Sequence, residues 1–428
     1  MTDNDRSIVA LVTMGHGLVH TYELSIPIFM TVWLAQMGSS EATLGVLVGA
    51  GYLLFGVGAL PGGLLADRFG ARRLIALCLA GMGGAFVLLG LLPGMWGLGT
   101  ALVAWGAAAS LYHPAGLALI STGVQQRGRV LAYHGIAGNV GIAGGPLLTA
   151  LLLVWVDWPV VAVLLGLPAL GAAVRAWRMP VDETAAVVQR EGTEAQPLSP
   201  ASAGEGGALW RQTRRLFSSG FAGVFVLVAL SGLYYRGMLT FLPDLLTPLV
   251  TVDLPVEVAP GRYVYAGLLA VGIGGQYVGG RLSERDGIER TLAGALGGLA
   301  GIAVLFLPVA GLGTGGLLAM SAALGFVLFL VQPLYQAAVA EATPPQARGV
   351  SYGYTYLAIF GVGALGAALA GALLQRAGPP LLFGGLAVIA LAAAGLSAVL
   401  ARRRTARERA AFEGGCGRVG GGGCEEGQ

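Results

Sequence analysis

Hydrophobic residues fill long stretches of this chain, and polar residues are confined to the short segments between them. A helix needs about 20 apolar residues to cross a hydrocarbon core of about 30 Å, and the stretches have that length. The pattern therefore predicts twelve membrane spans: residues 8–35, 43–65, 74–92, 97–121, 130–155, 159–177, 218–249, 262–282, 291–311, 314–339, 350–374 and 380–400.

Composition supports a membrane protein. The chain is 55% hydrophobic and 11% charged, whereas soluble domains carry about 25% charged residues. The first span follows a short polar leader (MTDNDRS), is too long for the hydrophobic part of a signal peptide and lacks a cleavage site, so we expect it to be retained. The net charge of +3 comes from arginines in short loops and does not indicate a nucleic-acid partner.

The arginines predict the orientation of the spans. All 25 basic residues are arginine, and most of those between spans fall on one face, while Arg236, Arg262 and Arg376 do not. Basic loops are enriched on the cytoplasmic side, and an even number of spans places both termini there. The expected fold class is an all-α membrane protein with cytoplasmic N- and C-termini.

Two polar segments divide the chain. Residues 179–215 are rich in Pro, Ser, Gly and Glu and predict a cytoplasmic linker, and residues 401–428, basic and then Gly-rich, predict a flexible cytoplasmic tail. Residues 1–178 and 216–400 are then two six-helix halves. The two cysteines of the tail lack the spacing of a zinc site, so we expect no metal and no cofactor.

A glycine-flanked charged turn occurs twice. GGLLADRFGARR covers residues 62–73, and GGRLSERDGIER covers residues 279–290, about half the chain further on. The repeat extends to the fourth and tenth spans, where LYHPAGLALIST and LVQPLYQAAVAE align Pro114 with Pro333. Internal repeats are typical of secondary transporters, which bind their substrate near the midplane between the repeats.

The first turn resembles the signature loop of the major facilitator superfamily, G-x-x-x-D-R-x-G-x-R-R. The matching residues are Gly63, Asp67, Arg68, Gly70, Arg72 and Arg73, and the second, degenerate copy has Gly280, Glu284, Arg285 and Gly287. Gly63 and Gly70 are expected to permit close backbone approach and a tight turn. The resemblance covers essentially the whole chain and implies two pseudo-symmetric halves that rock about a central site. It also implies a cytoplasmic gate in which Asp67 contacts the start of span eleven and, by symmetry, Glu284 contacts the start of span five.

The fifth span contains GIAGGPLLTA, which partly matches the G-x-x-x-G-P-x-x-G-G pattern of proton-coupled antiporters in this superfamily. Gly141, Gly145 and Pro146 match, while Thr149 and Ala150 stand where the pattern ends in two glycines. Because G-x-x-x-G also serves ordinary helix packing, an antiporter motif and a packing motif both remain open.

Polar side chains form a stripe along the first span. They are spaced three and four residues apart and so share one helical face: Thr13, His16, His20, Glu23 and Pro27. An ionisable group at mid-bilayer costs about 2.5–3.5 kcal/mol and therefore faces a cavity or a partner. Arg236 in span seven lies near the same depth by the repeat offset, which predicts a Glu23–Arg236 pair across the cavity. A static structural pair, or an Arg236 that reaches outward to the interface, is the alternative.

These groups define the candidate site. Histidine titrates near neutral pH, which suits proton coupling, although each histidine could instead be a packing residue. The candidates for proton or substrate coupling are His16, His20, Glu23, His113 and Arg236. The candidates for lining a substrate cavity are Tyr112, Asn139, Tyr235, Gln332 and Gln336.

The segments GHGLVHTYE, HPAG and RGRVLAYHGIAGNVG also resemble the fosmidomycin-resistance-type exporters, which implies efflux of small, often anionic or amphipathic compounds in exchange for protons. We expect a secondary active transporter of the cell membrane that works by alternating access, with proton-coupled efflux. Proton-coupled uptake of a metabolite or organic anion is the alternative, and a membrane sensor is a remote one. The expected partners are a small-molecule substrate, protons and the lipid bilayer, and the expected state is a monomer.

An enzyme is not expected. A Walker loop is excluded because the chain has no lysine, and H-E-x-x-H is absent. One G-x-S-x-G occurs, GVSYG at residues 349–353, but it follows no predicted strand, so Ser351 lacks the strand–turn–helix setting of a nucleophile.

Overall fold

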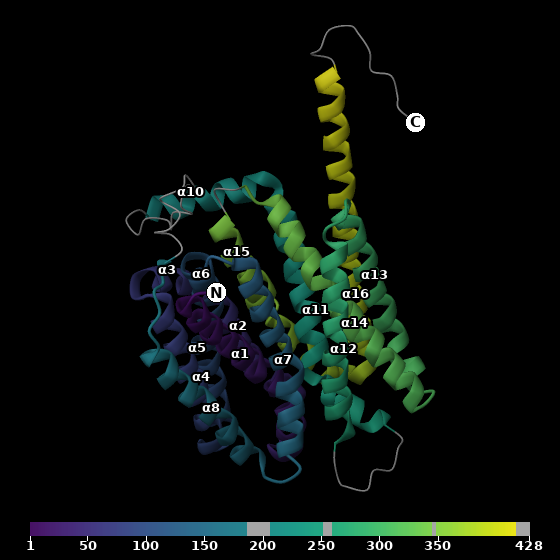
Figure 1. The fold of residues 1–428 in the computed structure, drawn as a ribbon. Coiled ribbons are helices and arrows are strands. Elements are labelled where there is room, and N and C mark those ends of the chain that lie inside the picture. The colour runs from purple at the N-terminus through teal and green to yellow at the C-terminus, as the bar shows by residue number, and fades with distance from the viewer. Residues whose placement is uncertain (186–205, 251–258, 345–347, 417–428) are drawn as a thin grey trace.

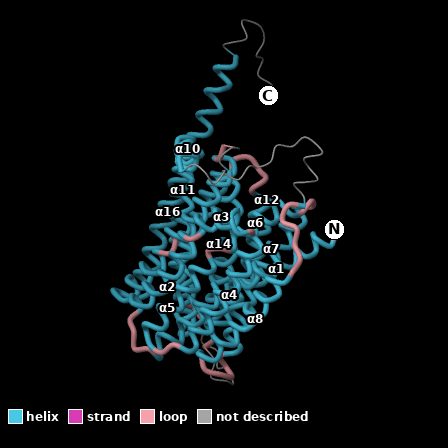
Figure 2. The backbone as a smooth tube through the Cα atoms, turned by 90° about the vertical axis from the view of Figure 1, so that its left-hand side faces the viewer, coloured by secondary structure: helices cyan, strands magenta, loops and turns pink. Residues whose placement is uncertain are grey.

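The computed structural model describes residues 1–185, 206–250, 259–344 and 348–416. Within these ranges the chain is almost entirely helical and contains no β-strand. Most helices run roughly along one direction, side by side (Figure 1), and the view turned by 90° shows the same elongated bundle (Figure 2).

Within residues 1–185, the first part of the bundle contains eight described helices that form six membrane-length stretches. Two stretches are interrupted, one at Gly58 and one at Ser110 and Leu111. The helices are α1 (Asp3–Gln36), α2 (Glu41–Val57), α3 (Ala59–Phe69), α4 (Ala71–Leu91), α5 (Gly94–Ala109), α6 (Tyr112–Gly123), α7 (Arg127–Leu152) and α8 (Trp158–Arg178).

The second part begins with α10 (Gly206–Leu216), which lies across the top of the molecule in Figure 1. A π-helical turn, η1 (Phe217–Phe221), leads into α11 (Ala222–Leu246) and the short η2 (Thr247–Leu249). The remaining elements are α12 (Pro260–Leu282), α13 (Ile288–Ala310), α14 (Thr314–Ala342), α15 (Arg348–Tyr356), the π-helical η4 (Leu357–Val362) and α16 (Leu365–Cys416).

Ten helical stretches of the described residues are long and apolar enough to cross a membrane. One of them, Val350–Ala406, is 57 residues long. It contains a break at Ala377 and Gly378, between the two spans expected at 350–374 and 380–400. The 23-residue α12 is not among the ten. The chain is thus an all-helical membrane protein, as its apolar stretches predict.

Parts of the expected linker and tail are helical. Residues 186–205 of the linker and 417–428 of the tail lie outside the described residues. The end of the linker forms α10, and α16 continues beyond residue 400 to Cys416. The linker therefore ends in a helix, and the tail begins in one.

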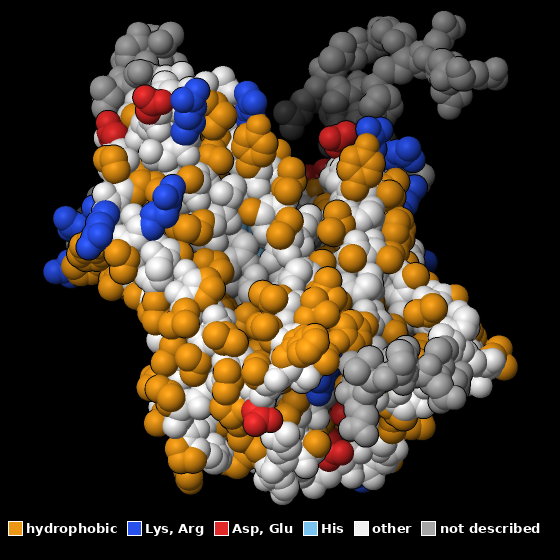
Figure 3. Space-filling view, turned by 60° about the horizontal axis from the view of Figure 1, so that its bottom comes forward, with side chains coloured by type: hydrophobic (Ala, Val, Ile, Leu, Met, Phe, Trp, Pro, Cys, Tyr) orange, Lys and Arg blue, Asp and Glu red, His pale blue; other side chains and the backbone are white. Residues whose placement is uncertain are grey.

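Side-chain contacts place helix ends of opposite direction at the same end of the bundle. Asn4, at the start of α1, donates from Nδ2 to the carbonyl of Gly123 at 3.3 Å and to that of Asp182 at 2.9 Å. Gly123 is the last residue of α6 and Asp182 follows the end of α8, so α1 runs opposite to both. The visible side of the molecule is mostly hydrophobic, and most of its basic side chains gather towards one end (Figure 3).

Candidate functional site

An ion pair lies buried between α1 and α11. The Arg236 guanidinium donates from Nη2 to Glu23 Oε1, and the two residues are 2% and 0% exposed. Burying two charges is costly, and their mutual attraction must offset that cost. Because Glu23 belongs to the first part of the chain and Arg236 to the second, this contact joins the two.

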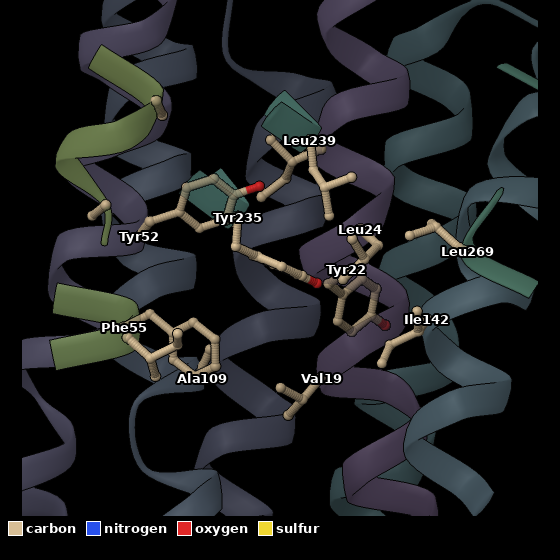
Figure 4. Packing of buried hydrophobic residues seen from close by; sticks show 14 of the residues in the cluster. Val19, Tyr22, Leu24, Tyr52, Phe55, Ala109, Ile142, Tyr235, Leu239 and Leu269 are labelled. Atoms are coloured by element: carbon tan, nitrogen blue, oxygen red, sulfur yellow. The ribbon is translucent and has the colours of Figure 1, made fainter. Parts of the chain in front are cut away.

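Aromatic rings surround the arginine. Its Cζ atom lies 3.8 Å from the ring centroid of Tyr52 and 5.4 Å from those of Tyr235 and Phe360. Tyr52 also donates its hydroxyl to the backbone carbonyl of Glu23 at 3.1 Å. Tyr52 and Tyr235 are among the buried residues that gather where α1, α2, α7 and α11 meet (Figure 4). The ring faces attract the guanidinium charge by cation–π interaction.

A chain of contacts leads from Glu23 along α1 to α7. His20 Nδ1 lies 2.6 Å from Glu23 Oε2, and His20 Nε2 lies 3.1 Å from His16 Nε2. His16 Nδ1 then lies 2.7 Å from the backbone carbonyl oxygen of His134. Three members of the stripe predicted on span one therefore form a connected polar network, while Thr13 donates to the carbonyl of Val9 in its own helix at 2.6 Å.

The other histidines pack around this chain. The ring of His134 stacks on His16 with centroids 3.7 Å apart, and His113 stacks on Tyr356 at 4.9 Å. Ring nitrogens of His16, His20 and His113 lie within 4.8 Å of one another, and they are the single group of this kind in the described ranges. The Nε2 atoms of His16 and His20 face each other at hydrogen-bond distance, 3.1 Å, so we assign no metal here.

Glycines allow α7 to pack closely against α1, and this packing positions the polar contacts between the two helices. A Cβ at Gly141 would lie 2.1 Å from the carbonyl oxygen of Gly17, and one at Gly145 would lie 2.6 Å from Cα of Thr21. Pro146 lies inside α7 directly after this contact. Thr149, one turn further, donates to Ser25 Oγ at 2.7 Å. In this structure the glycines of span five are thus part of helix packing.

The predicted cavity residues are not all at the ion pair. Tyr235 adjoins Arg236, and the ring of Tyr112 stacks on His16 with centroids 5.7 Å apart. Asn139 is half-buried on α7, and Gln336 on α14 is exposed. The amide oxygen of Gln332 accepts a hydrogen bond from Gln276 at 2.7 Å.

The two signature turns share a backbone feature. Gly70 has φ +88° and Gly287 has φ +79°, a region that favours glycine. A Cβ at Gly63 or Gly280 would meet no atom within 4 Å, so close backbone approach does not explain those two glycines in this structure.

The gate residues can be placed only in part. Arg68 lies over the ring of Phe69, Arg73 and Arg285 are exposed, and so is Glu284. The side chain of Asp67 and residues 345–347, before span eleven, lie outside the described part of the structure.

A carboxylate of the expected linker caps the first signature turn. Glu183 accepts from the backbone amides of Ala71 and Arg72 at 2.8 and 3.0 Å. These amides open α4, where unpaired N–H groups and the helix dipole favour an anion. The start of the expected linker is therefore hydrogen-bonded to the first signature turn.

Sequence reasoning did not select Tyr52, Phe360 or His134 for the site. The two aromatic residues lie in apolar spans and carry no polar signal in the pattern. His134 takes part through its backbone carbonyl and its ring face, which no side-chain pattern reveals.

Comparison with known proteins agrees with this architecture. The sequence profile of the Major Facilitator Superfamily matches residues 9–367. The chain belongs to this superfamily of membrane transporters. It is therefore a multi-pass transporter of the plasma membrane and not an enzyme.

Two curated relatives match part of the chain. The inner membrane transport protein YajR of Escherichia coli is 31% identical over 193 residues, which is 42% of this chain and 41% of YajR. The puromycin resistance protein pur8 of Streptomyces alboniger is 35% identical over 126 residues, or 29% of this chain and 25% of pur8. The matched region thus spans less than half the length of either relative.

Solved structures match nearly the whole fold. A bacterial homolog of the human lysosomal transporter Spinster, in an inward-facing and occupied conformation, has a TM-score of 0.71 at 16% identity, covering 94% of this chain and 98% of its own. The nucleoside transporter NupG has a TM-score of 0.71 at 12% identity, covering 93% and 99%. At these identities the likeness establishes the fold.

Proposed function

We propose that this protein exports a small molecule in exchange for protons by alternating access. The observation that carries the proposal is the buried Glu23–Arg236 pair, which joins the two parts of the bundle at a depth where an unpaired charge would be costly. A change of protonation next to this contact alters the tie to Arg236, and the balance between two conformations shifts accordingly.

The proposal includes a topology of twelve spans in two six-helix halves, 1–178 and 216–400. Adding α12 to the ten apolar stretches gives eleven spans. Dividing the longest stretch at the break at Ala377 and Gly378 gives twelve. The linker of 179–215, the tail of 401–428 and both termini then lie in the cytoplasm. The basic side chains at one end of the molecule support this orientation.

Within this cycle Glu23, His16 and His20 carry the coupling, with His113 as a buried neighbour and Arg236 as the counter-ion. Tyr112, Tyr235, Asn139, Gln332 and Gln336 contribute to the cavity at different depths. The two signature turns close the cytoplasmic side, with Asp67 and Glu284 as the latching acids. The motif of Gly141, Gly145 and Pro146 keeps α1 and α7 in register. The transporter acts as a monomer.

Efflux is favoured over uptake because one matching relative is a puromycin resistance protein, and because the local motifs resemble exporters. Uptake of an organic anion is the second candidate. Arg236 favours it, since an anionic substrate could replace Glu23 as its partner.

The test uses respiring inside-out vesicles that contain the protein, with the acid-interior gradient followed by a quenched dye. Puromycin, phosphonates and organic anions are added in turn. We expect at least one compound to dissipate the gradient with the parent protein, and Glu23→Gln to abolish that response. Glu41→Gln, a change at the start of α2 outside the ion pair, serves as the matched control and should respond like the parent.

The outcomes separate the parts of the proposal. A response that persists in Glu23→Gln keeps antiport but removes Glu23 from the coupling path. If no compound in a broad panel dissipates the gradient, efflux is wrong, and accumulation of organic anions by whole cells then tests the second candidate.

A further inference from the structure

Three consecutive contacts link Glu23, His20, His16 and the carbonyl oxygen of His134. They are Glu23 Oε2 to His20 Nδ1 at 2.6 Å, His20 Nε2 to His16 Nε2 at 3.1 Å, and His16 Nδ1 to the His134 carbonyl at 2.7 Å. All three lie within hydrogen-bond distance. Each one needs a hydrogen between its two atoms, because two facing lone pairs repel each other.

The number of hydrogens can be counted. A carbonyl oxygen only accepts, so Nδ1 of His16 carries a hydrogen and, in a neutral ring, Nε2 of His16 carries none. A neutral His20 has one hydrogen but two contacts to fill, towards Glu23 and towards His16. An ionised Glu23 brings none. The three contacts therefore need three hydrogens, whereas the neutral rings and the carboxylate supply two.

From this count we infer that Glu23, His20 and His16 bind one exchangeable proton as a single unit. The inference rests on the proposed function, in which this proton is the one coupled to transport. The proton moves among the three side chains and belongs to no single residue, so the two histidines and the carboxylate bind and release it together.

Exposure indicates where the proton enters. The side chain of His20 is 13% exposed and that of Glu23 is 1% exposed. His20 thus lies closer to the accessible surface than the carboxylate does. The unit conveys a proton from this accessible end to the acid that holds Arg236.

The groups around the unit do not supply the missing hydrogen. Tyr112 donates its hydroxyl to the carbonyl of Val12, and Tyr52 donates to the carbonyl of Glu23. Nε2 of His113 and Nε2 of His134 are buried without a hydrogen-bond partner. Arg236 is the nearby cation, and it donates to the other oxygen of Glu23.

Loss of the proton changes the geometry next to the ion pair. Without it, the two Nε2 atoms present lone pairs to each other, or His20 loses its hydrogen bond to Glu23. Either change moves His20, which is directly bonded to the acid of the Glu23–Arg236 tie. The unit thereby connects proton release to the contact between the two parts of the bundle.

The test is ring nitrogen NMR on full-length protein labelled with ¹⁵N-histidine in lipid nanodiscs. The chain has four histidines, so single substitutions assign every signal. We expect His16 and His20 to lose one proton between them in a single joint transition as the pH rises. His16→Phe, which removes the nitrogen but keeps a ring to stack on His134, should abolish the joint transition.

A second variant and a control guard against misfolding. Glu23→Gln keeps the shape of the acid and should weaken proton binding by His20. His134→Phe retains the backbone carbonyl and a stacking ring, so His16 and His20 should still lose their proton in one joint transition.

Three results would overturn the inference. The first is separate, independent proton loss by His16 and His20, and the second is that neither Nε2 atom carries a proton at any pH. The third is a change in the Nε2 signals on adding a chelator, since a metal ion would then fill the contact. The NMR experiment uses neither substrate nor a proton gradient. A negative vesicle assay would therefore not contradict the shared proton, and independent titration of the two histidines would not contradict transport.

Discussion

At the scale of residues, the charge pair of Glu23 and Arg236 is balanced only while both members are present. Arg236→Met or Glu23→Leu alone leaves one buried charge unpaired, which costs about 3–5 kcal/mol. The double variant removes both charges, so we expect each single variant to unfold at a lower temperature than the double variant in detergent. Equal, additive losses would show that the two side chains act independently.

Tyr52 has two separable roles at the same site. Its ring lies under Arg236, and its hydroxyl bonds to the backbone of Glu23. Tyr52→Phe keeps the ring and loses one hydrogen bond, worth about 1 kcal/mol. Tyr52→Leu also loses the cation–π contact, worth about 2 kcal/mol when desolvated. We expect the Leu variant to be the less thermostable of the two, and the reverse order would contradict the assigned role of the ring.

The site residues that could be predicted are the polar ones, because they stand out within apolar spans. The spacing of His16, His20 and Glu23 predicts one helical face, and the repeat offset predicts the partner Arg236, which the structure pairs with Glu23. The order of the contacts could not be predicted, because it depends on a backbone carbonyl of α7. The coupling roles themselves remain predictions.

At the scale of elements, the contact between α1 and α7 depends on glycines, which have no side chain to keep the helices apart. Gly141 and Gly145 face α1, while a Cβ at Gly144, on the same helix, would meet no atom within 4 Å. Gly144→Ala should therefore be neutral or stabilising, since alanine favours a helix by about 1 kcal/mol over glycine. Gly141→Ala should force the helices apart, lowering thermostability and transport. Equal behaviour of the two alanine variants would refute this packing.

Helix positions follow from apolar length, but not every helix interruption does. The break at Gly58 lies inside the predicted span 43–65, whereas that at Ala377 and Gly378 lies between the spans predicted at 350–374 and 380–400. A Cβ at Gly58 would lie 2.3 Å from the hydroxyl oxygen of Ser110, so the first break brings two spans together. Such contacts between distant segments leave no periodic signal along the chain.

At the scale of the whole molecule, two polar contacts tie α1 to the second part of the bundle. One is the Glu23–Arg236 pair, and the other is the donation from Arg262 Nε to Thr31 Oγ1 at 2.9 Å. Eight residues of helix separate Glu23 from Thr31, or about 12 Å along the axis. A rocking motion that opens the Thr31 end thus has to break the second contact, while the central pair can act as the pivot.

The orientation and number of spans lead to a test on the intact protein. In a cysteine-free background, single cysteines replace Trp96, Asp286 or Leu312, which are exposed positions between or near helix ends. If α12 crosses the membrane and the termini are cytoplasmic, an impermeant maleimide added to whole cells labels Trp96→Cys and Leu312→Cys but not Asp286→Cys. If α12 does not cross, each later segment is inverted, and the reagent labels Asp286→Cys in place of Leu312→Cys. Permeabilised cells provide the control, because all three cysteines should then react. The Asp286 and Leu312 positions thereby decide between twelve spans and a count that omits α12, and Trp96 decides the side on which the chain begins.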